Sequence, residues 1–208
     1  MAHTLLLATN NPGKVREFRQ LLAGIADLEL IALDQVAPTP EVIEDGASFE
    51  DNARKKAGEI AAATHMLVLS DDSGLEVDAL GGRPGVHSAR YAGPRASDDD
   101  NNAKLVRELA RVPEARRTAR YRVVLALADP RGPLGDAVHF EHGVCEGRIR
   151  LTPAGHDGFG YDPYFEPARC TCTMAELTPE QKNRLSHRAQ ATAAMRRFLE
   201  RYLPTRAL

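Results

Sequence analysis

Two adjacent aspartates, Asp71 and Asp72, follow an apolar run and are followed at once by Ser73 and Gly74. Neighbouring carboxylates repel each other and are costly to bury without a cation. A divalent metal ion such as Mg²⁺, which takes oxygen ligands, relieves that repulsion. Because all of these residue types also form turns, the stretch is either a metal site or a solvated turn.

The position of this acidic pair depends on the elements around it. Residues 66–69 form an apolar run that predicts a short buried strand, and polar groups at the carboxyl end of such a strand lie where open α/β sheets bind ligands. Glu44 lies in an irregular stretch just before a helix that Ser48 is expected to cap. Glu44 either favours that helix N-terminus or joins the aspartates as a further metal ligand, and the spacing leaves both open.

A possible anion site opens the chain. Residues 4–8 predict a strand, residues 9–14 form a turn cluster, and a helical pattern follows. This is the layout in which loop amides and a helix N-terminus receive an anion, and Lys14 stands where its ammonium group reaches a phosphate. The spacing is not that of a P-loop, and a capped turn with a solvated lysine is the structural alternative.

Glycines alternate with aromatic residues between residues 155 and 165. Glycine lets the backbone approach a ligand closely, and an exposed Phe159 ring can stack on a base. The alternative is a hairpin with packed aromatics.

A long glycine-rich loop over residues 81–93 is also of a length that is more often functional than not.

Two helix starts near the C-terminus carry further polar groups. Thr178, followed by a proline and Gln181, predicts a capped helix that carries Lys182. We expect the next helix to follow Ser186, with His187 and Arg188 in its first turn. Two hydrogen-bond donors at a helix start favour a ligand acceptor nearby.

A run of acidic residues follows Ser97, which we expect to cap a helix through about residue 112. The run, Asp98, Asp99 and Asp100, resembles a metal site. Capping and favourable interaction with the helix dipole are the favoured interpretation.

Strands are also expected at residues 28–33, 121–128 and 137–149, the last two as an antiparallel pair. Strands that alternate with helices indicate an α/β fold.

Composition bounds the function. The 208 residues suggest one domain, or one domain in two lobes, and 43% hydrophobic with 27% charged residues is ordinary for a globular protein. A net charge of −2 and the lack of a long apolar run argue against nucleic acid and membrane partners. Residues 1–8 lack the features of a signal peptide, so we expect a cytoplasmic protein with reduced thiols. Cys170 and Cys172 suit a soft metal, but no fitting His or Cys follows them.

Taken together and in this order, the motifs resemble those of the inosine triphosphate pyrophosphatase family, the noncanonical purine NTP pyrophosphatases. The resemblance spans nearly the whole chain and departs from the family pattern at residues 169–172, which lie off the motifs. The matching pieces are Thr9-Asn10-Asn11 with Lys14, residues 70–75, Pro84-Gly85, residues 88–91, residues 158–163, Ala175-Glu176-Leu177 with Lys182, and Ser186-His187-Arg188.

The resemblance implies a fold and an activity. The fold would be a single α/β domain over residues 1–208, with a long mixed central sheet flanked by helices and a substrate cleft between two lobes, usually in a homodimer. The activity would be Mg²⁺-dependent hydrolysis of a nucleoside triphosphate between the α- and β-phosphates. The substrates would be ITP, dITP and XTP, and the products the monophosphate and pyrophosphate.

The resemblance also implies roles for individual residues. Asp72 would be the catalytic base and a metal ligand, with Glu44 as second ligand. The base site would include Phe159, which would stack on the purine, while His187 and Arg188 would donate to its 6-oxo group. Because adenine carries an amino group there, donors would face donors and ATP would be rejected. The other substrate-binding residues would be Thr9, Asn10, Asn11, Pro12, Gly13, Lys14, Ser73, Gly160, Tyr161, Asp162 and Lys182.

Two alternatives remain open on the sequence alone. One is a pyrophosphatase that acts on other modified nucleotides, which a substrate panel would separate. The other is a nucleotide-binding protein without turnover, which would bind ITP but release no pyrophosphate.

Overall fold

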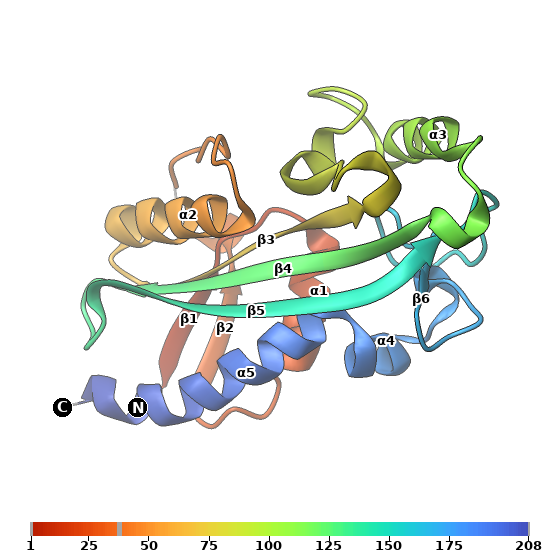
Figure 1. Cartoon of the computed structure of the whole chain (residues 1–208). Helices are drawn as coiled ribbons and strands as arrows, with labels where there is room; N and C mark the ends of the chain where they lie inside the picture. The colour runs from red at the N-terminus through yellow and green to blue at the C-terminus, as the bar shows by residue number, and fades with distance from the viewer. Residues whose placement is uncertain (1, 37–38, 208) are drawn as a thin grey trace. The chain divides into compact units, whose positions relative to one another are not determined.

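The structure is a computed structural model that describes residues 2–36 and 39–207. It contains a six-stranded sheet with strand order β2-β1-β3-β4-β5-β6 (Figure 1). The strands are β1 (His3–Leu7), β2 (Leu28–Ala32), β3 (Leu67–Val77), β4 (Thr118–Asp129), β5 (Gly135–Ile149) and β6 (Phe165–Pro167). The helices are α1 (Pro12–Leu21), α2 (Phe49–Thr64), α3 (Asp98–Leu109), α4 (Pro179–Leu185) and α5 (His187–Tyr202).

The sheet is mixed, as expected. Strand β1 pairs in parallel with both β2 and β3, whereas β5 pairs antiparallel with β6. The five residues between β4 and β5 are too few for a parallel crossover, so these neighbours form a hairpin. The predicted α/β fold with a long mixed sheet and flanking helices is confirmed. No helix in the described ranges is long and apolar enough to cross a membrane.

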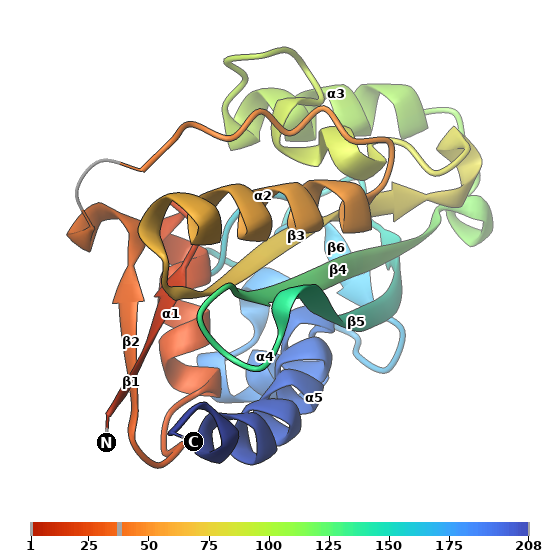
Figure 2. The ribbon, with the colours of Figure 1, turned by 90° about the vertical axis from the view of Figure 1, so that its left-hand side faces the viewer.

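The chain divides into two compact units. The first comprises the described residues within 1–72, 124–142 and 190–208, and the second comprises residues 73–123 and 143–189. In the first unit, α2 lies on one face of the parallel strands, and α1 and α5 lie on the other (Figures 1 and 2). Its core includes Leu5, Leu6 and Phe18, each at most 1% exposed.

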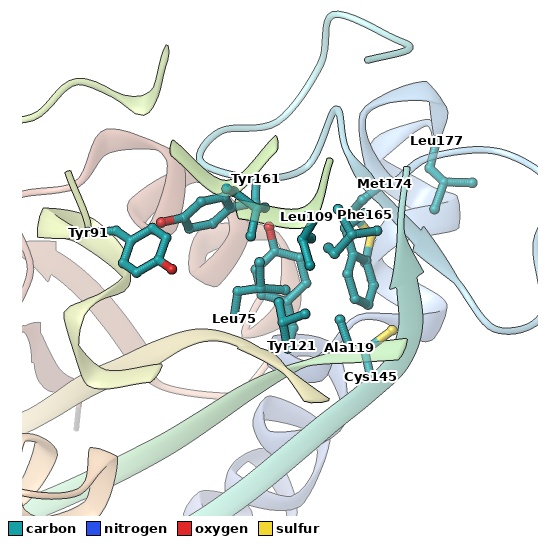
Figure 3. Packing of buried hydrophobic residues seen from close by; sticks show 13 residues of the cluster. Leu75, Tyr91, Leu109, Ala119, Tyr121, Cys145, Tyr161, Phe165, Met174 and Leu177 are labelled. Carbon is teal, nitrogen blue, oxygen red and sulfur yellow. The ribbon is translucent and has the colours of Figure 1, made fainter. Parts of the chain in front are cut away.

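The second unit has its own hydrophobic core, in which aromatic rings meet the inner face of α3 (Figure 3). Leu105 and Leu109 of α3 are fully buried, and their spacing of four residues puts them on one face of the helix. The rings of Tyr121 and Phe165 lie 4.6 Å apart between centroids in a tilted arrangement. This core supports the loop that carries Tyr161, which is 4% exposed.

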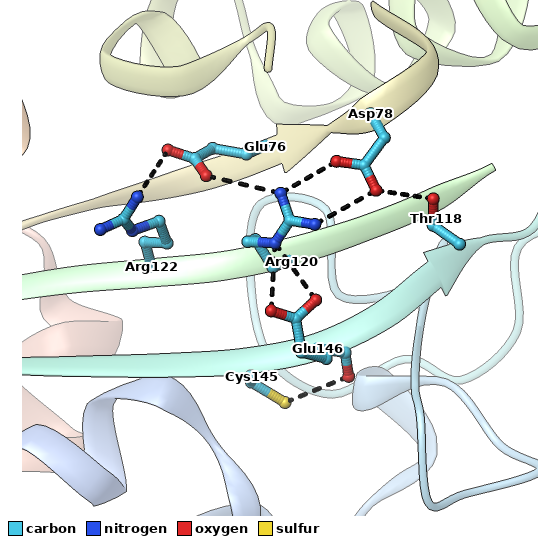
Figure 4. Close-up of polar contacts among 7 residues, drawn as sticks. All are labelled: Glu76, Asp78, Thr118, Arg120, Arg122, Cys145 and Glu146. Carbon is cyan, nitrogen blue, oxygen red and sulfur yellow. Dashed lines mark hydrogen bonds and ion pairs between the residues drawn. The ribbon is translucent and has the colours of Figure 1, made fainter. Parts of the chain in front are cut away.

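Polar side chains tie the strands of the second unit together at its surface (Figure 4). Arg120 Nη1 lies 2.9 Å from Asp78 Oδ1, and Arg120 Nε lies 3.1 Å from Glu146 Oε1. Hydrogen bonds from Thr118 and Arg120 hold the pKa of Asp78 below its ordinary value. Exposed pairs of this kind each contribute up to about 1 kcal/mol, so the network adds modestly to the stability of this unit.

The three cysteines are free thiols. Burial raises the pKa of Cys145 to about 11 and also raises that of Cys172. The thiolate is the reactive form of cysteine, so these thiols are held in their unreactive state. No group of three His, Cys, Asp or Glu side chains in residues 2–36 and 39–207 is arranged to hold a metal ion.

One prediction about the sheet is wrong. The strand expected over residues 66–69 does not end before Asp71 but continues as β3 through Ser73 to Val77. The acidic pair therefore lies within a strand, and Asp71 is 1% exposed rather than part of a solvated turn. The strand tolerates Asp71 because its carboxylate is paired with Lys14.

Candidate active site

In the first unit, polar residues at the middle of β3 are each held by a neighbouring helix. Ser70 Oγ donates to the Ala53 carbonyl in α2 at 2.7 Å, and Asp71 is paired with Lys14 of α1. Because side chains alternate along a strand, Asp71 and Asp72 point to opposite faces of the sheet. Two repelling carboxylates thus point apart, and the Asp71 carboxylate is neutralised by Lys14.

The start of α1 places the first predicted anion-binding residues. Asn11 caps the helix: its Oδ1 accepts from the amides of Gly13 at 2.8 Å and Lys14 at 3.1 Å. Pro12 occupies the first helical position, where its missing N–H costs nothing. The Asn11 side chain is therefore engaged in capping, and Thr9 Oγ1 accepts from the Asn11 amide at 3.2 Å.

Three contacts from α2 fix the segment that carries Glu44. Lys56 Nζ lies 2.7 Å from Glu44 Oε1, Lys55 Nζ lies 2.7 Å from Asp45 Oδ1, and Asn52 Oδ1 accepts from the Gly46 amide at 2.7 Å. Lys56 Nζ also donates to the Asp71 carbonyl at 3.0 Å. Lys56 thus links Glu44 to the backbone of the acidic pair.

Asp72 is the unusual carboxylate of this group. It is 6% exposed, and its Oδ2 has no hydrogen-bond partner in the part of the chain that the structure describes. Burial raises its pKa from an ordinary 3.8 to about 6; the ammonium groups of Lys56 and Lys14 oppose the rise and Glu44 adds to it. A buried carboxylate with an open oxygen and a pKa near neutrality has the properties of a general base.

In the second unit, Asp162 is the centre of a buried polar cluster. Its Oδ2 accepts from Lys182 Nζ at 2.8 Å and from the Phe159 amide at 3.1 Å, and its Oδ1 accepts from the Tyr121 hydroxyl at 3.1 Å. Asp162 and Lys182 are 4% and 8% exposed. The predicted residues of the loop and of α4 are therefore brought together.

Phe159 is partly exposed, and two cations lie over its ring. Lys182 Nζ is 5.0 Å and the Arg188 guanidinium carbon 5.7 Å from the ring centroid. Both lie within the range of cation–π attraction, which fixes the ring relative to both side chains. Phe159 is therefore not one of the packed core aromatics, whereas Tyr161 is: its hydroxyl donates to the Ser88 carbonyl at 2.7 Å.

His187 and Arg188 stand at the start of α5, as predicted. Ser186 Oγ accepts from the Ala189 amide at 3.1 Å and so caps the helix. The His187 ring stacks on Tyr121, with centroids 4.8 Å apart and 11° between the planes. Arg188 is 2% exposed, and its Nη2 lies 3.1 Å from Ser73 Oγ. The two donors are thus held rigidly by their neighbours.

Sequence reasoning missed Lys56 and Tyr121. Lys56 follows Asn52 by one helical turn beside the small apolar stripe of α2, so a shared face was the available signal. Tyr121 lies in a strand whose following residues are mostly apolar, and burial with the nearby Asp162 raises its pKa well above the ordinary value. It keeps its proton and remains a hydrogen-bond donor.

Comparison with known proteins gives a consistent result. A sequence model of the Ham1 family matches residues 5–198. A protein of Shouchella clausii named dITP/XTP pyrophosphatase is 47% identical over 200 residues, covering 96% of this chain and 98% of its own length.

Solved structures agree. A HAM1 protein from Coxiella burnetii superposes with a TM-score of 0.84 at 36% identity, covering 96% of this chain and 99% of that one. A nucleoside-triphosphatase, also named dITP/XTP pyrophosphatase, from Mycobacterium abscessus gives a TM-score of 0.72 at 44% identity, covering 92% of this chain and 98% of that one. The resemblance seen in the motifs is confirmed.

Proposed function

Because the chain belongs to the Ham1 family, we propose that it hydrolyses noncanonical purine nucleoside triphosphates, namely ITP, dITP and XTP, to the monophosphate and pyrophosphate. The observation that carries this proposal is Asp72, a buried carboxylate with one open oxygen beside two lysines. A carboxylate in this state suits abstraction of a proton from water that attacks phosphorus. The names of the relatives support the choice of substrate.

The first unit supplies the groups for the triphosphate. We assign Lys14 to neutralise phosphate charge, with polar groups of the loop over residues 9–13 as further hydrogen-bonding partners. Lys56 is added to this set because its ammonium group lies against Glu44 and the Asp71 carbonyl. Asp72 acts as the base.

The donor set also fits Mg²⁺. Glu44 and Asp72 offer carboxylate oxygens, and the open Asp72 Oδ2 is a buried acceptor of the kind that a cation satisfies. Two carboxylates suffice, because Mg²⁺ usually keeps several waters and shares its remaining contacts with substrate phosphates. When bound, the ion would neutralise phosphate charge and lower the pKa of the attacking water.

The second unit supplies the groups for the base. Phe159 stacks on the purine, Asp162 fixes the Phe159 amide, and Lys182 adds a positive charge beside them. His187 and Arg188 donate to the 6-oxo group. An adenine amino group in the same place would face donors, so ATP is a poor substrate.

We further propose that the whole chain acts as one domain in a cytoplasmic homodimer, as its resemblance to the family implies. Gel filtration with light scattering tests the oligomeric state.

The proposed chemistry is tested by incubating ITP with the wild-type protein and Asp72→Asn and measuring pyrophosphate and inosine monophosphate. The variant keeps the shape of the side chain but removes the charge, so turnover should fall by about 10²- to 10⁴-fold. Circular dichroism checks that the fold is intact. Turnover within a few-fold of wild type would exclude Asp72 as the base, and inosine diphosphate as product would exclude α–β cleavage.

A further inference from the structure

Both backbone polar groups of Gly160 are bound by one helix, α3. The Gly160 amide donates to Asp98 Oδ2 at 2.7 Å, and Asn102 Nδ2 donates to the Gly160 carbonyl at 2.9 Å. Asp98 and Asn102 are four residues apart, so they lie on the same face of the helix. The two side chains together hold the two peptide groups on either side of the Gly160 Cα, next to Phe159.

Gly160 is a position that needs such support. Its φ is +63°, in the left-handed region, and a glycine there loses the most conformational freedom on ordering. The preceding amide, that of Phe159, is bound to Asp162 Oδ2 at 3.1 Å. The backbone is therefore fixed on both sides of the Phe159 side chain.

The helix that makes these contacts is itself firmly placed. Leu105 and Leu109 are fully buried, and Asn101 Oδ1 accepts from the Ala92 amide at 2.8 Å. Asp98 differs from its neighbours in the acidic run. Ser97 caps the helix, as predicted, and Asp100 completes a capping box with it, whereas Asp98 reaches out of the helix to the loop.

Asn102 is a costly residue for purely structural purposes. It is 5% exposed, and its Oδ1 has no hydrogen-bond partner within the described residues. A buried polar atom without a partner is destabilising, so an apolar side chain would serve the packing better. The bond that Asn102 does make is the one to Gly160, and this accounts for an amide at this site.

We propose that Asp98 and Asn102 are positioning residues that set the orientation of the Phe159 ring and thereby place the purine against the donors of His187 and Arg188. The inference rests on the proposed function of the second unit. If the hydrogen bonds to the Gly160 backbone are lost, the Phe159 ring can tilt and the purine on it shifts. The 6-oxo group of ITP then loses its alignment with the donors, while ATP, which makes no such bonds, loses little.

The test compares Asp98→Ala with Asp99→Ala. Both variants remove one negative charge from the first turn of α3, but the Asp99 side chain makes no hydrogen bond or ion pair with any described residue. The matched pair therefore separates the Gly160 contact from the helix-dipole effect. Asn102→Ala removes the other half of the support. The readouts are kcat/KM for ITP and ATP, the melting temperature, and hydrogen–deuterium exchange of the peptide covering residues 157–162.

We expect Asp98→Ala and Asn102→Ala each to lower the ITP/ATP ratio of kcat/KM roughly 3- to 10-fold, the factor expected for one lost hydrogen bond. Exchange in residues 157–162 should become faster, and Asp99→Ala should match the wild type. The inference is overturned if Asp98→Ala and Asp99→Ala behave alike. It is also overturned if both nucleotides decline equally along with the melting temperature.

Failure of the proposed function is recognised separately. If the wild-type protein releases no pyrophosphate from any nucleotide, the proposed function is wrong. The same variants are then compared by the ratio of dissociation constants for ITP and ATP. A ratio that Asp98→Ala and Asn102→Ala leave unchanged overturns the inference, and a ratio of the ITP to the ATP dissociation constant that rises only in those two variants supports it.

Discussion

Lys182 donates to Asp162 Oδ2 at 2.8 Å, and both side chains are buried. The same carboxylate accepts from the Phe159 amide and from the Tyr121 hydroxyl. One buried charge pair therefore joins α4, the loop of Phe159 and strand β4. Such a pair is weak support for stability as a whole, but removing one partner is strongly destabilising.

We predict that Asp162→Asn lowers the free energy of unfolding by about 3–5 kcal/mol, because the buried Lys182 ammonium loses the charge that faces it. Urea unfolding measures the effect. The control is Glu200→Gln in the exposed Arg196–Glu200 pair, whose side chains are 32% and 47% exposed. That variant should change stability by about 0.5 kcal/mol or less. A loss below about 1 kcal/mol in Asp162→Asn would show that the pair does not hold the cluster together.

The pKa of Asp72 predicts a pH-dependent stability of the metal-free protein. Burial raises this pKa from 3.8 in the unfolded chain to about 6, against the attraction of Lys56 and Lys14 and with the repulsion of Glu44. The folded protein thus binds more protons between these values, so stability falls as pH rises through about 6. Above that pH the charged side chain costs on the order of 3 kcal/mol.

We therefore expect Asp72→Asn to melt several degrees above the wild type at pH 8 in the presence of EDTA, and close to it at pH 4.5. The control is Asp71→Asn, which should melt below the wild type at pH 8 because Asp71 is paired with Lys14. Thermal melts at both pH values provide the comparison. An equal melting difference at pH 4.5 and pH 8 would show that Asp72 is not the titrating group.

We predict that Lys14→Ala weakens the binding of all nucleoside triphosphates by similar factors, because Lys14 is assigned to phosphate oxygens alone. The melting temperature should also fall, since buried Asp71 loses its cation. Values of kcat/KM for ITP, XTP and GTP are measured well below the melting temperature. A tenfold change in the ITP/GTP ratio would place Lys14 near the base instead.

We predict that Arg188→Ala lowers kcat/KM for ITP roughly 10- to 150-fold, the range for a charge-assisted bond to the 6-oxo group. ATP should lose little. Arg188 is 2% exposed, so truncation also lowers the melting temperature, and the nucleotide ratio is the informative readout. Arg188→Lys keeps the charge but not the planar guanidinium group. Its ITP/ATP ratio of kcat/KM should lie between those of the wild type and Arg188→Ala. An unchanged ITP/ATP ratio in Arg188→Ala would exclude Arg188 as a reader of the base.

Local patterns could be predicted from the sequence because their cause lies within a few residues. Ser97 caps α3 as expected, and Thr178 with Gln181 forms the expected capping box. The length of β3 could not be predicted, because Asp71 is tolerated in a strand only through a lysine that lies 57 positions earlier. Local composition therefore indicated a turn where the fold has a strand.

In the candidate site, too, the features that could be predicted are local and those that could not depend on long-range contacts. The motif residues around Asp162 and Lys182 are brought together as expected, but no local pattern indicates which carboxylate pairs with which cation. Lys56 was missed because its contact with Glu44 depends on how a loop folds over α2. The local pattern around Asp98 indicates only helix capping. Its bond to Gly160 joins positions 62 residues apart and therefore leaves no signal in the local sequence.

The central claim is that this protein cleaves noncanonical purine triphosphates between the α- and β-phosphates and rejects ATP. The most direct measurement is pyrophosphate release by the wild-type protein with Mg²⁺ over a panel of ITP, dITP, XTP, GTP and ATP. Donors that face a 6-oxo group should give kcat/KM for ITP, dITP and XTP at least about 10²-fold above that for ATP. Equal rates for ITP and ATP, or no pyrophosphate from any member of the panel, would contradict the account.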